Sequence, residues 1–197
     1  CECLAALRPF VDGHHPDVGE SIQSIGRLAA ELHEAMKTYP RPLTRCSRQV
    51  HIDDFIAFMT EHFGARESDI RELEEYGHTV WERVENLPAG FCHNDFHNHN
   101  MILQDQRIVL FDFDTASVGH PMFDVASICD RTDFWKVTPD DVDSTLTYLE
   151  QFNDAYSTSG SLSDGELASV FGCIAVRHCR LHGIRDRAPI RGSSHMT

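Results

Sequence analysis

The chain has 197 residues, of which 41% are hydrophobic, and this size and composition favour one domain around a single core. Acidic residues outnumber basic ones by 31 to 17, and the formal net charge of −14 disfavours nucleic acid and anionic membranes as partners and favours cationic ligands and metal ions. Solubility alone also explains this charge. The sequence has no basic-then-apolar start, no apolar run of about eighteen residues and no C-x-x-C pair, so we expect a cytoplasmic protein without a membrane span, signal peptide or disulfide framework.

The first predicted elements are an extended segment and a helix. Residues 4–11 form an apolar run that ends at a turn signal in residues 12–13. Asp17, with Glu20 three positions later, is typical of a helix N-cap, and apolar residues recur at helical spacing as far as Met36. We therefore predict an amphipathic helix after an extended entry.

Two more amphipathic helices are predicted before the centre of the chain. The first carries Phe55 and Met59 on its apolar face and stops at Gly64. The second begins at Ser68, keeps one face apolar, and is broken by residues 87–90, whose sequence is LPAG.

The centre of the chain has the pattern of a tight β-hairpin. Two short apolar runs, MIL and IVLF, flank the polar residues 105–107. If the hairpin is centred on position 106, Asn100 lies directly across from Asp112, with about 5 Å between their Cβ atoms. One amide and one carboxylate therefore converge beside this hairpin.

Two more carboxylates belong to the same region. Asp95 lies five residues before Asn100, and Asp114 lies two residues after Asp112, on the same face if the strand continues. Three carboxylates and an amide oxygen in one place need a positive charge. Mg²⁺ prefers such oxygen ligands and keeps open positions for phosphate, so the pattern favours phosphate chemistry.

Two capped helices are predicted in the last third of the chain. Thr138 and Pro139 form an N-cap with proline in the first turn, and apolar residues follow at helical spacing as far as Tyr156. Ser163 and Glu166 form a second capping box that opens a last helix. With the helices predicted earlier, the chain is expected to be mostly helical around one hairpin.

Two stretches of the chain resemble the signatures H-x-D-x-x-x-x-N and D-x-D of aminoglycoside phosphotransferases and choline kinases. They are residues 93–100, HNDFHNHN, and residues 111–114, FDFD. The resemblance extends through residues 119–126 and, more weakly, back to residues 26–33, so it covers most of the chain. A kinase catalytic loop needs an aspartate at the acceptor hydroxyl and an asparagine at the metal, and the combined spacing is a specific match.

The resemblance implies an α+β, mostly helical fold, the C-terminal lobe of a protein-kinase-like enzyme with a catalytic-loop hairpin. By this resemblance Asp95 would orient the acceptor hydroxyl and receive its proton. Asn100 and Asp112 would hold Mg²⁺ against the phosphates of ATP or GTP, and Asp114 would assist with a second metal ion. The activity implied is a phosphotransferase, a small-molecule kinase.

The resemblance also implies structural support for the catalytic loop. His93 would hold the loop, and Asp124 would anchor it from the following helix. The sequence departs from the family where glycine is usual but Asn94 stands, and where small residues or proline are usual but Asn98 and His99 stand. Asparagine tolerates positive φ better than most residues, so the first departure is mild.

The acceptor is expected to be a small molecule with a hydroxyl group. Among the acidic residues after the hairpin, Asp130 and Asp133 are candidates to bind an amino-rich acceptor such as an aminoglycoside, which would imply antibiotic resistance. Such residues are more often solvated surface. Choline-like amines, sugars, homoserine and other antibiotics remain open as acceptors.

The same region of the sequence suits three other functions less well. A zinc site could use four side chains near the signature: Cys92, His93, His97 and His99. They do not have a known four-ligand spacing. A metal-dependent phosphohydrolase could use His93, Asp95 and Asp112 with a metal-bound water, although Asn100 stands where a second histidine would be more useful. A degenerate module could bind a small cation without turnover.

The domain boundaries follow from the resemblance. We predict an inter-lobe connection, a catalytic lobe and a flexible tail at residues 1–16, 17–183 and 184–197. Neither Lys37 nor Lys136 is suited to the nucleotide-aligning lysine on a strand, and no G-x-G-x-x-G or Walker A sequence occurs. We therefore expect a partial chain that lacks the N-terminal nucleotide lobe and has poor activity alone. An apolar strip of Leu4, Leu7 and Phe10 would then be exposed and favour self-association.

Overall fold

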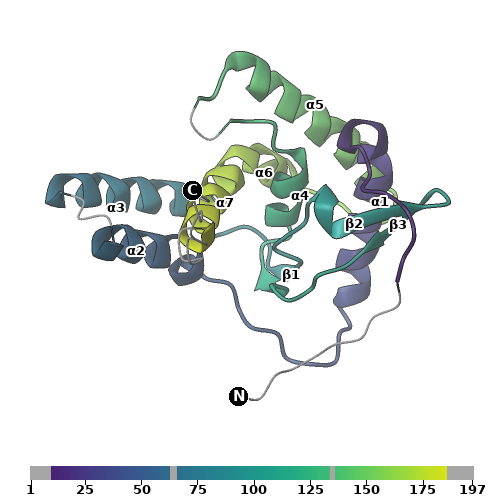
Figure 1. Cartoon of the computed structure of the whole chain (residues 1–197), viewed down its shortest axis with the longest axis horizontal. Coiled ribbons are helices and arrows are strands. Elements are labelled where there is room, and N and C mark those ends of the chain that lie inside the picture. The colour runs from purple at the N-terminus through teal and green to yellow at the C-terminus, as the bar shows by residue number, and fades with distance from the viewer. Residues whose placement is uncertain (1–9, 63–65, 134–135, 186–197) are drawn as a thin grey trace, which may run out of the picture.

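The computed structural model describes residues 10–62, 66–133 and 136–185. Helices dominate this part of the chain, and four short strands form two separate two-stranded sheets (Figure 1). The longer helices are α1 (Val18–Met36), α3 (Glu67–Glu82), α5 (Pro139–Tyr156) and α7 (Val170–Arg185). The shorter helices are α2 (Asp54–His62), α4 (Met122–Cys129) and α6 (Asp164–Ala168), with a π-helical turn η1 (Gln49–Asp53) and a 3-10 turn η2 (Asn98–Asn100). The strands are β1 (Gly90–Cys92), β2 (Met101–Gln104), β3 (Arg107–Leu110) and β4 (Ser117–Gly119).

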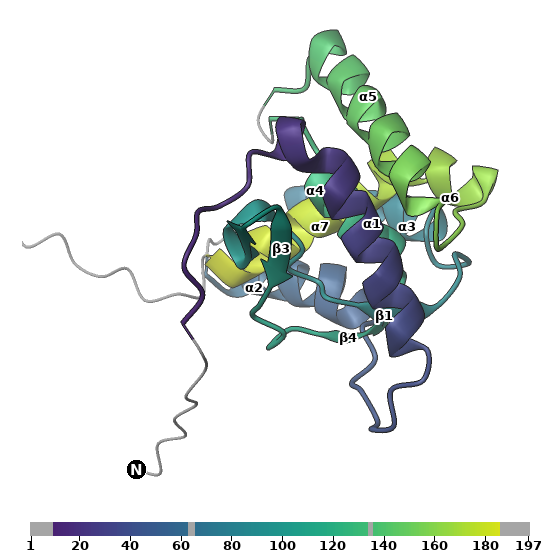
Figure 2. The same ribbon diagram turned by 90° about the vertical axis from the view of Figure 1, so that its right-hand side faces the viewer.

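Helices α1 and α5 begin at the predicted N-caps. The Asp17 side chain accepts a hydrogen bond of 2.9 Å from the backbone N–H of Glu20, and Thr138 forms a reciprocal capping box with Asp141. The two helices pack against each other along one side of the molecule (Figure 2). Both predicted helices are therefore confirmed, and their caps fix where the packed apolar faces begin.

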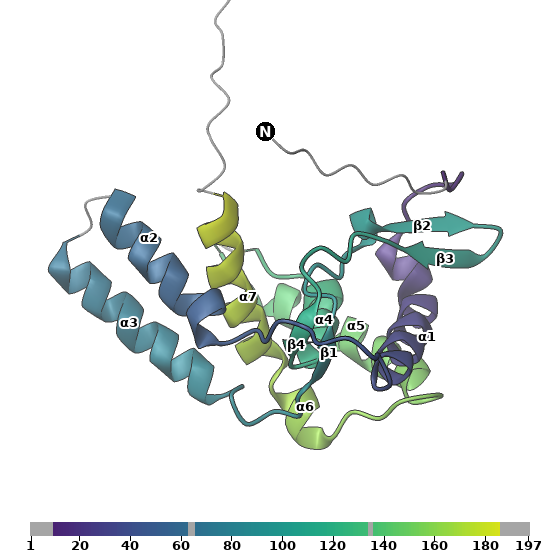
Figure 3. The ribbon, with the colours of Figure 1, turned by 90° about the horizontal axis from the view of Figure 1, so that it is seen from below.

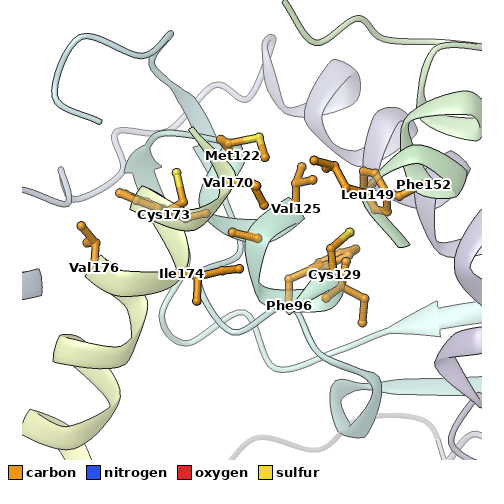
Figure 4. Close-up of a cluster of buried hydrophobic side chains, with 14 of the residues drawn as sticks. Phe96, Met122, Val125, Cys129, Leu149, Phe152, Val170, Cys173, Ile174 and Val176 are labelled. Atoms are coloured by element: carbon orange, nitrogen blue, oxygen red, sulfur yellow. The ribbon is translucent and has the colours of Figure 1, made fainter. Parts of the chain in front are cut away.

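Helix α4 forms the centre of the core. All eight of its residues are buried, and it contacts α5 and α7. Side chains from these three helices cluster together with Phe96, which comes from the loop after β1 (Figure 4). Phe96 is fully buried, and burial of such a ring contributes roughly 1.5–3 kcal/mol. This ring anchors the loop that carries the kinase-like signature in the core.

The turn η1 and helices α2 and α3 form an arm that packs along α7 (Figure 3). Ile52, Ile56 and Val80 are its buried residues in the main core. The two helices predicted here are confirmed as α2 and α3, and α3 begins one residue before Ser68. The predicted helix end at Gly64 lies outside the described residues.

The hairpin β2–β3 is present, but its predicted register is wrong by one residue. Met101 pairs with Leu110, so the turn has two central residues, Asp105 and Gln106, with φ values of 46° and 66°. A two-residue turn with positive φ matches the natural twist of the two strands and is the commonest hairpin connection. In the observed register Phe111 lies across from Asn100, and its backbone N–H donates to the Asn100 carbonyl at 3.0 Å.

Strand β3 ends at Leu110, and this overturns a second expectation. Asp112 has a φ of 63°, which turns the chain out of the strand direction. Asp112 and Asp114 therefore do not share a face of a continuing strand. A one-residue shift of register moves every side chain of a strand to the opposite face, so the predicted faces of these residues depended entirely on the assumed register.

Two other elements differ from the predictions. Strands β1 and β4 pair although each has only three residues, and nothing in the sequence predicted them. The single helix predicted after Ser163 breaks at Ser169, whose hydroxyl donates to the carbonyl of Glu166 at 2.6 Å. Helix α7 continues to Arg185, two residues beyond the predicted end of the lobe.

The entry segment is described only from Phe10 onwards. His14 forms an antiparallel bridge with Leu103 of β2, so the described part of the entry runs beside the hairpin. Gly13 permits this approach, because a Cβ there would lie 2.4 Å from the Leu103 carbonyl oxygen. Leu4 and Leu7 lie outside the described residues, as do residues 186–197. None of the described helices is long and apolar enough to cross a membrane.

Candidate active site

The loop between β1 and β2, residues 93–100, holds the candidate catalytic residue Asp95. Its carboxylate Oδ1 lies 3.2 Å from Nε2 of His97, and Oδ2 accepts a hydrogen bond of 2.8 Å from Nδ2 of Asn100. The hydrogen bond from His97 is the main reason why the pKa of Asp95 falls to about 2. Asp95 is therefore a carboxylate at neutral pH and can accept a hydrogen bond from an acceptor hydroxyl.

Asn100 is buried at the end of the same loop. Its amide nitrogen donates both to the Asp95 carboxylate and, at 2.9 Å, to the Asp95 carbonyl. Within the described chain, its amide oxygen has no hydrogen-bond partner. The structure thus brings Asp95 and Asn100 together and leaves the amide oxygen available as a cation ligand.

Asp124 of α4 anchors the start of the loop. Its buried carboxylate accepts hydrogen bonds from the backbone N–H groups of His93 at 2.7 Å and Asn94 at 2.8 Å. His33 of α1 also lies within hydrogen-bond distance of it, at 3.2 Å, and the Nδ1 of His33 lies 3.0 Å from the Tyr156 hydroxyl. A buried carboxylate needs several donors, and these contacts supply them to Asp124. The supporting roles of His93 and Asp124 remain predictions.

Asp112 lies one residue beyond Phe111, the residue that pairs with Asn100. It is therefore a neighbour of Asn100 at the end of the hairpin, although not its direct partner. Asp114 follows in an exposed turn. The predicted convergence of three carboxylates is not seen, since no three His, Cys, Asp or Glu side chains in the described part of the chain are grouped closely enough to hold a metal ion.

This donor set still fits Mg²⁺. That ion is commonly bound through one or two carboxylates together with waters and substrate phosphates, and it does not require a cage of protein ligands. An amide oxygen and a nearby carboxylate, from Asn100 and Asp112, meet that requirement. The same finding argues against the zinc alternative, because Cys92 and the histidines of the loop do not form a ligand group.

Asp130 and Asp133, the candidates to bind the acceptor molecule, have partners within the protein. Asp130 accepts hydrogen bonds through Oδ1 from the backbone N–H and hydroxyl of Thr132, and its Oδ2 lies 2.9 Å from Nε2 of His178 and 3.8 Å from Arg177. Asp133 accepts a hydrogen bond of 3.1 Å from the backbone N–H of Lys136. A contact of either residue with an acceptor remains a prediction.

The contacts of two residues at the site were not predicted from the sequence. His97 lies in the signature, but its contact with Asp95 depends on the shape of the loop. Arg180 comes from α7, 86 residues away, and its Nη1 donates to the carbonyl of Asn94 at 3.2 Å. No local pattern marks an arginine on a helix for such a contact.

A mostly apolar cavity of about 430 Å³ lies between α2, α3 and α7. Its lining includes three aromatic side chains: Phe55, Tyr76 and Phe171. His178, which lies near Asp130, also lines it, two residues before Arg180 on α7. A larger cavity of about 970 Å³ lies beside the C-terminal end of α1. His33 lines this cavity and also contacts Asp124, which anchors the loop of residues 93–100.

Two comparisons with known sequences agree with the signatures. The family model described as the phosphotransferase enzyme family matches residues 1–164. Protein LicA of Haemophilus influenzae is 32% identical over 76 residues, which cover 39% of this chain and 28% of LicA. The chain therefore spans only part of the length of this relative.

Solved structures share the fold at low sequence identity. Amicoumacin kinase hAmiN, in complex with AMP-PNP, Ca²⁺ and Ami, has a TM-score of 0.67 at 19% identity, over 90% of this chain and 55% of that one. A microcompartment-associated aminopropanol kinase has a TM-score of 0.64 at 19% identity, over 83% and 53%. A choline/ethanolamine kinase family protein from Mesorhizobium loti has a TM-score of 0.63 at 15% identity, over 88% and 59%.

The chain thus spans somewhat more than half the length of each of these kinases, and its predicted kinase-like α+β fold is confirmed. The family model covers well over half of the chain and includes the whole catalytic loop and the segment with Asp112 and Asp114. The chain therefore belongs to the phosphotransferase enzyme family, as its resemblance to aminoglycoside phosphotransferases and choline kinases predicted.

Proposed function

We propose that this chain is the catalytic lobe of a small-molecule kinase that transfers the γ-phosphoryl group of ATP or GTP to a hydroxyl of a small, cationic acceptor. The observation that carries the proposal is the hydrogen-bonded pair of Asp95 and Asn100. The pair lies in the loop with the kinase signature, and Asp112 follows just beyond the adjoining hairpin. Belonging to the phosphotransferase family supports this reaction class.

In this mechanism Asp95 orients the acceptor hydroxyl by accepting its hydrogen bond. The hydroxyl oxygen forms the new bond to the γ-phosphorus, the bond from that phosphorus to the β–γ bridging oxygen breaks, and the hydroxyl proton passes to Asp95. A carboxylate with a pKa near 2 is a weak base, so orientation is its larger contribution. Asn100 and Asp112 would hold Mg²⁺, which when bound neutralises charge on the phosphate oxygens.

Turnover is proposed to need a nucleotide-binding lobe in addition to this chain. Alignment of the phosphates in kinases uses a lysine on a strand and a glycine-rich loop, and the sequence has no G-x-G-x-x-G motif. The related kinases of known structure are also longer than the chain. We therefore refer to a two-lobed protein, the chain joined to such a lobe, in the assays below.

The acceptor is proposed to carry an amine beside its hydroxyl. The net charge of −14 favours a cation, and aminopropanol, the substrate named for one related kinase, is an amino alcohol. The cavity between α2, α3 and α7 is a place for the cationic part of such a molecule, because aromatic side chains line it and aromatic faces attract organic cations. An aminoglycoside acceptor would add a role in antibiotic resistance.

The proposal is tested by supplying the two-lobed protein with Mg²⁺, labelled ATP or GTP and a panel of aminoglycosides, amino alcohols, choline-like amines and sugars. We expect label on at least one amine-bearing acceptor and little release of free phosphate without acceptor. Release of phosphate at the same rate in the absence of any acceptor would identify a phosphohydrolase. Binding of a cation with no turnover of any kind would identify a degenerate binding module.

A further inference from the structure

The acidic segment, residues 111–115, is tied to the catalytic loop at both of its ends. At its start, Nε2 of His93 lies 3.0 Å from the Phe111 carbonyl oxygen. At its end, the hydroxyl of Thr115 donates to the His93 carbonyl at 3.0 Å, and Nδ2 of Asn94 donates to the Thr115 carbonyl at 2.9 Å. Asp112 and Asp114 lie between these two attachments.

Asn94 makes one of these attachments and is itself held by several other parts of the chain. Its φ of 64° is in the left-handed region, where asparagine is tolerated better than most other residues. Its backbone N–H donates to Asp124 of α4, its carbonyl accepts from Arg180 of α7, and its amide nitrogen also donates to the hydroxyl of Ser117 of β4 at 2.7 Å. Three separate elements therefore fix the residue directly before Asp95.

The left-handed backbone alone does not explain this use of asparagine. Glycine adopts positive φ at no steric cost, so it would satisfy the backbone at position 94. The amide side chain of Asn94 also donates to Thr115 and Ser117, whereas glycine has no side chain and an aspartate there would lack the donor. The side chain therefore serves the link to the acidic segment.

We propose that Asn94 and Thr115 are positioning residues. They fix the position of Asp95, the group at the acceptor, relative to Asp112, the group at the metal. The inference rests on the proposed function for what Asp95 and Asp112 do, but the link itself is a property of the chain. Supporting residues of this kind commonly account for about 10- to 100-fold in metal affinity or activity. A displacement of about 1 Å at reacting groups has a comparable effect on rate.

Three variants of the two-lobed protein separate the side-chain bonds from the backbone. Asn94→Gly keeps the left-handed conformation and removes the amide. Thr115→Val removes the hydroxyl and keeps the shape, and Thr115→Ser restores a hydroxyl. Gln106→Gly is the matched control, because Gln106 is also left-handed, with a φ of 66°, but lies in the exposed hairpin turn.

Three readouts are measured on each variant: kcat and KM, the affinity for Mn²⁺ as a metal probe, and hydrogen exchange over residues 111–115 in the metal-free protein. We expect Asn94→Gly and Thr115→Val to lower kcat by about 10- to 100-fold, to weaken Mn²⁺ binding and to speed exchange, with KM for the acceptor within about 3-fold. Thr115→Ser and Gln106→Gly should stay close to the parent. A role in stability alone would lower the melting temperature and leave kcat and Mn²⁺ affinity unchanged.

The outcomes distinguish this inference from the proposed function. If the parent transfers phosphate and both Asn94→Gly and Thr115→Val keep its kcat and Mn²⁺ affinity, the positioning role is wrong and the function stands. If the parent transfers phosphate to no acceptor, the function is wrong. Mn²⁺ affinity and hydrogen exchange then still decide whether Asn94 and Thr115 hold the acidic segment. Unchanged exchange in both variants would also overturn the inference.

Discussion

At the scale of single residues, Asp112 has the clearest link between local geometry and proposed chemistry. It directly follows the residue that pairs with Asn100, and its left-handed φ of 63° turns the chain out of β3. The sequence located both residues but not their register, because a hairpin turn of two or three residues fits the same apolar pattern. The contact of His97 was missed because it depends on the shape of an irregular loop, and that of Arg180 because it joins α7 to a residue 86 positions away.

We predict that Asp112→Ala in the two-lobed protein abolishes metal-dependent nucleotide binding. Loss of an outer partner already weakens metal sites by about 10- to 100-fold, and removal of a direct ligand should cost at least as much. Titration calorimetry with Mg²⁺ and nucleotide measures the effect. Asp154→Ala, an equal change of charge at an exposed position of α5, is the control, and equal affinities in the two variants would exclude Asp112 as a ligand.

His51 makes stability depend on pH. Its ring is buried, neither ring nitrogen has a hydrogen-bond partner among the described residues, and burial, aided by the charge of Arg180, lowers its pKa from 6.5 to about 3. Because the folded pKa is below the unfolded one, the stabilisation is complete above about pH 6.5 and is lost as the pH falls towards 3.

We therefore predict that acidification from pH 7 to pH 5 costs about 2 kcal/mol through His51. His51→Phe should remove that part of the pH dependence, as measured by denaturant unfolding at the two pH values. His78→Gln, a change at an exposed histidine of α3, should leave it in place. If both variants respond to pH like the parent, His51 is not the group that titrates.

At the scale of elements, the sequence predicted helices better than strands. Capping residues such as Asp17 and Thr138 are local signals, and both predicted helix starts are observed. Strands β1 and β4 pair residues that lie far apart in sequence, such as Gly90 with Gly119, so no local sequence pattern predicts these strands. The break between α6 and α7 was missed because Ser169 interrupts a continuous apolar pattern only through its own hydrogen bonding.

The contact between α1 and α5 depends on Gly26. A Cβ at this position would lie 2.6 Å from the carbonyl oxygen of Phe152 and 3.3 Å from the Cβ of Ala155, so the helices approach more closely than alanine allows. In an open helix, Gly→Ala gains about 1 kcal/mol. Here the overlap with backbone should cost about 1–3 kcal/mol instead.

We predict that Gly26→Ala lowers the melting temperature by several degrees, at roughly 2–4 °C per kcal/mol. Gly165→Ala in α6 is the matched control, since its added Cβ would meet only the Ser163 hydroxyl oxygen, at 3.9 Å. Thermal unfolding followed by circular dichroism compares the two variants. A Gly26→Ala protein as stable as the control would mean that α1 and α5 can move apart to accept the added Cβ without a loss of thermal stability.

At the scale of the whole molecule, the resemblance to a known family determined the fold prediction. Apolar periodicity alone predicted a mostly helical chain, while the spacing of Asp95, Asn100 and Asp112 identified a kinase-like lobe. The family match confirms this assignment. The acceptor could not be predicted, because the signatures contain only residues assigned to catalysis, metal binding and loop support, and the cavity proposed for the acceptor is lined by helices far apart in sequence.

We predict that the 197-residue chain alone binds Mg²⁺ weakly and nucleotide poorly, and transfers no phosphoryl group. The reason is that the sequence has neither a lysine suited to a strand nor a G-x-G-x-x-G loop, which in kinases supply charge and positioning for the transferred phosphoryl group. Robust labelling of an acceptor by this chain alone would show that it needs no second lobe.

We also predict that exposed Phe10 favours self-association of the chain, which Phe10→Ser would reduce in sedimentation experiments.

The most direct test of the central claim is the turnover of Asp95→Asn in the two-lobed protein, measured with labelled nucleotide and the preferred acceptor. The substitution keeps the size of the side chain and removes the charge that accepts the hydroxyl proton. We predict a fall in kcat of about 10²–10⁴-fold with an unchanged fold, as judged by circular dichroism. Turnover close to that of the parent would contradict the assignment of Asp95 as the residue that orients the acceptor.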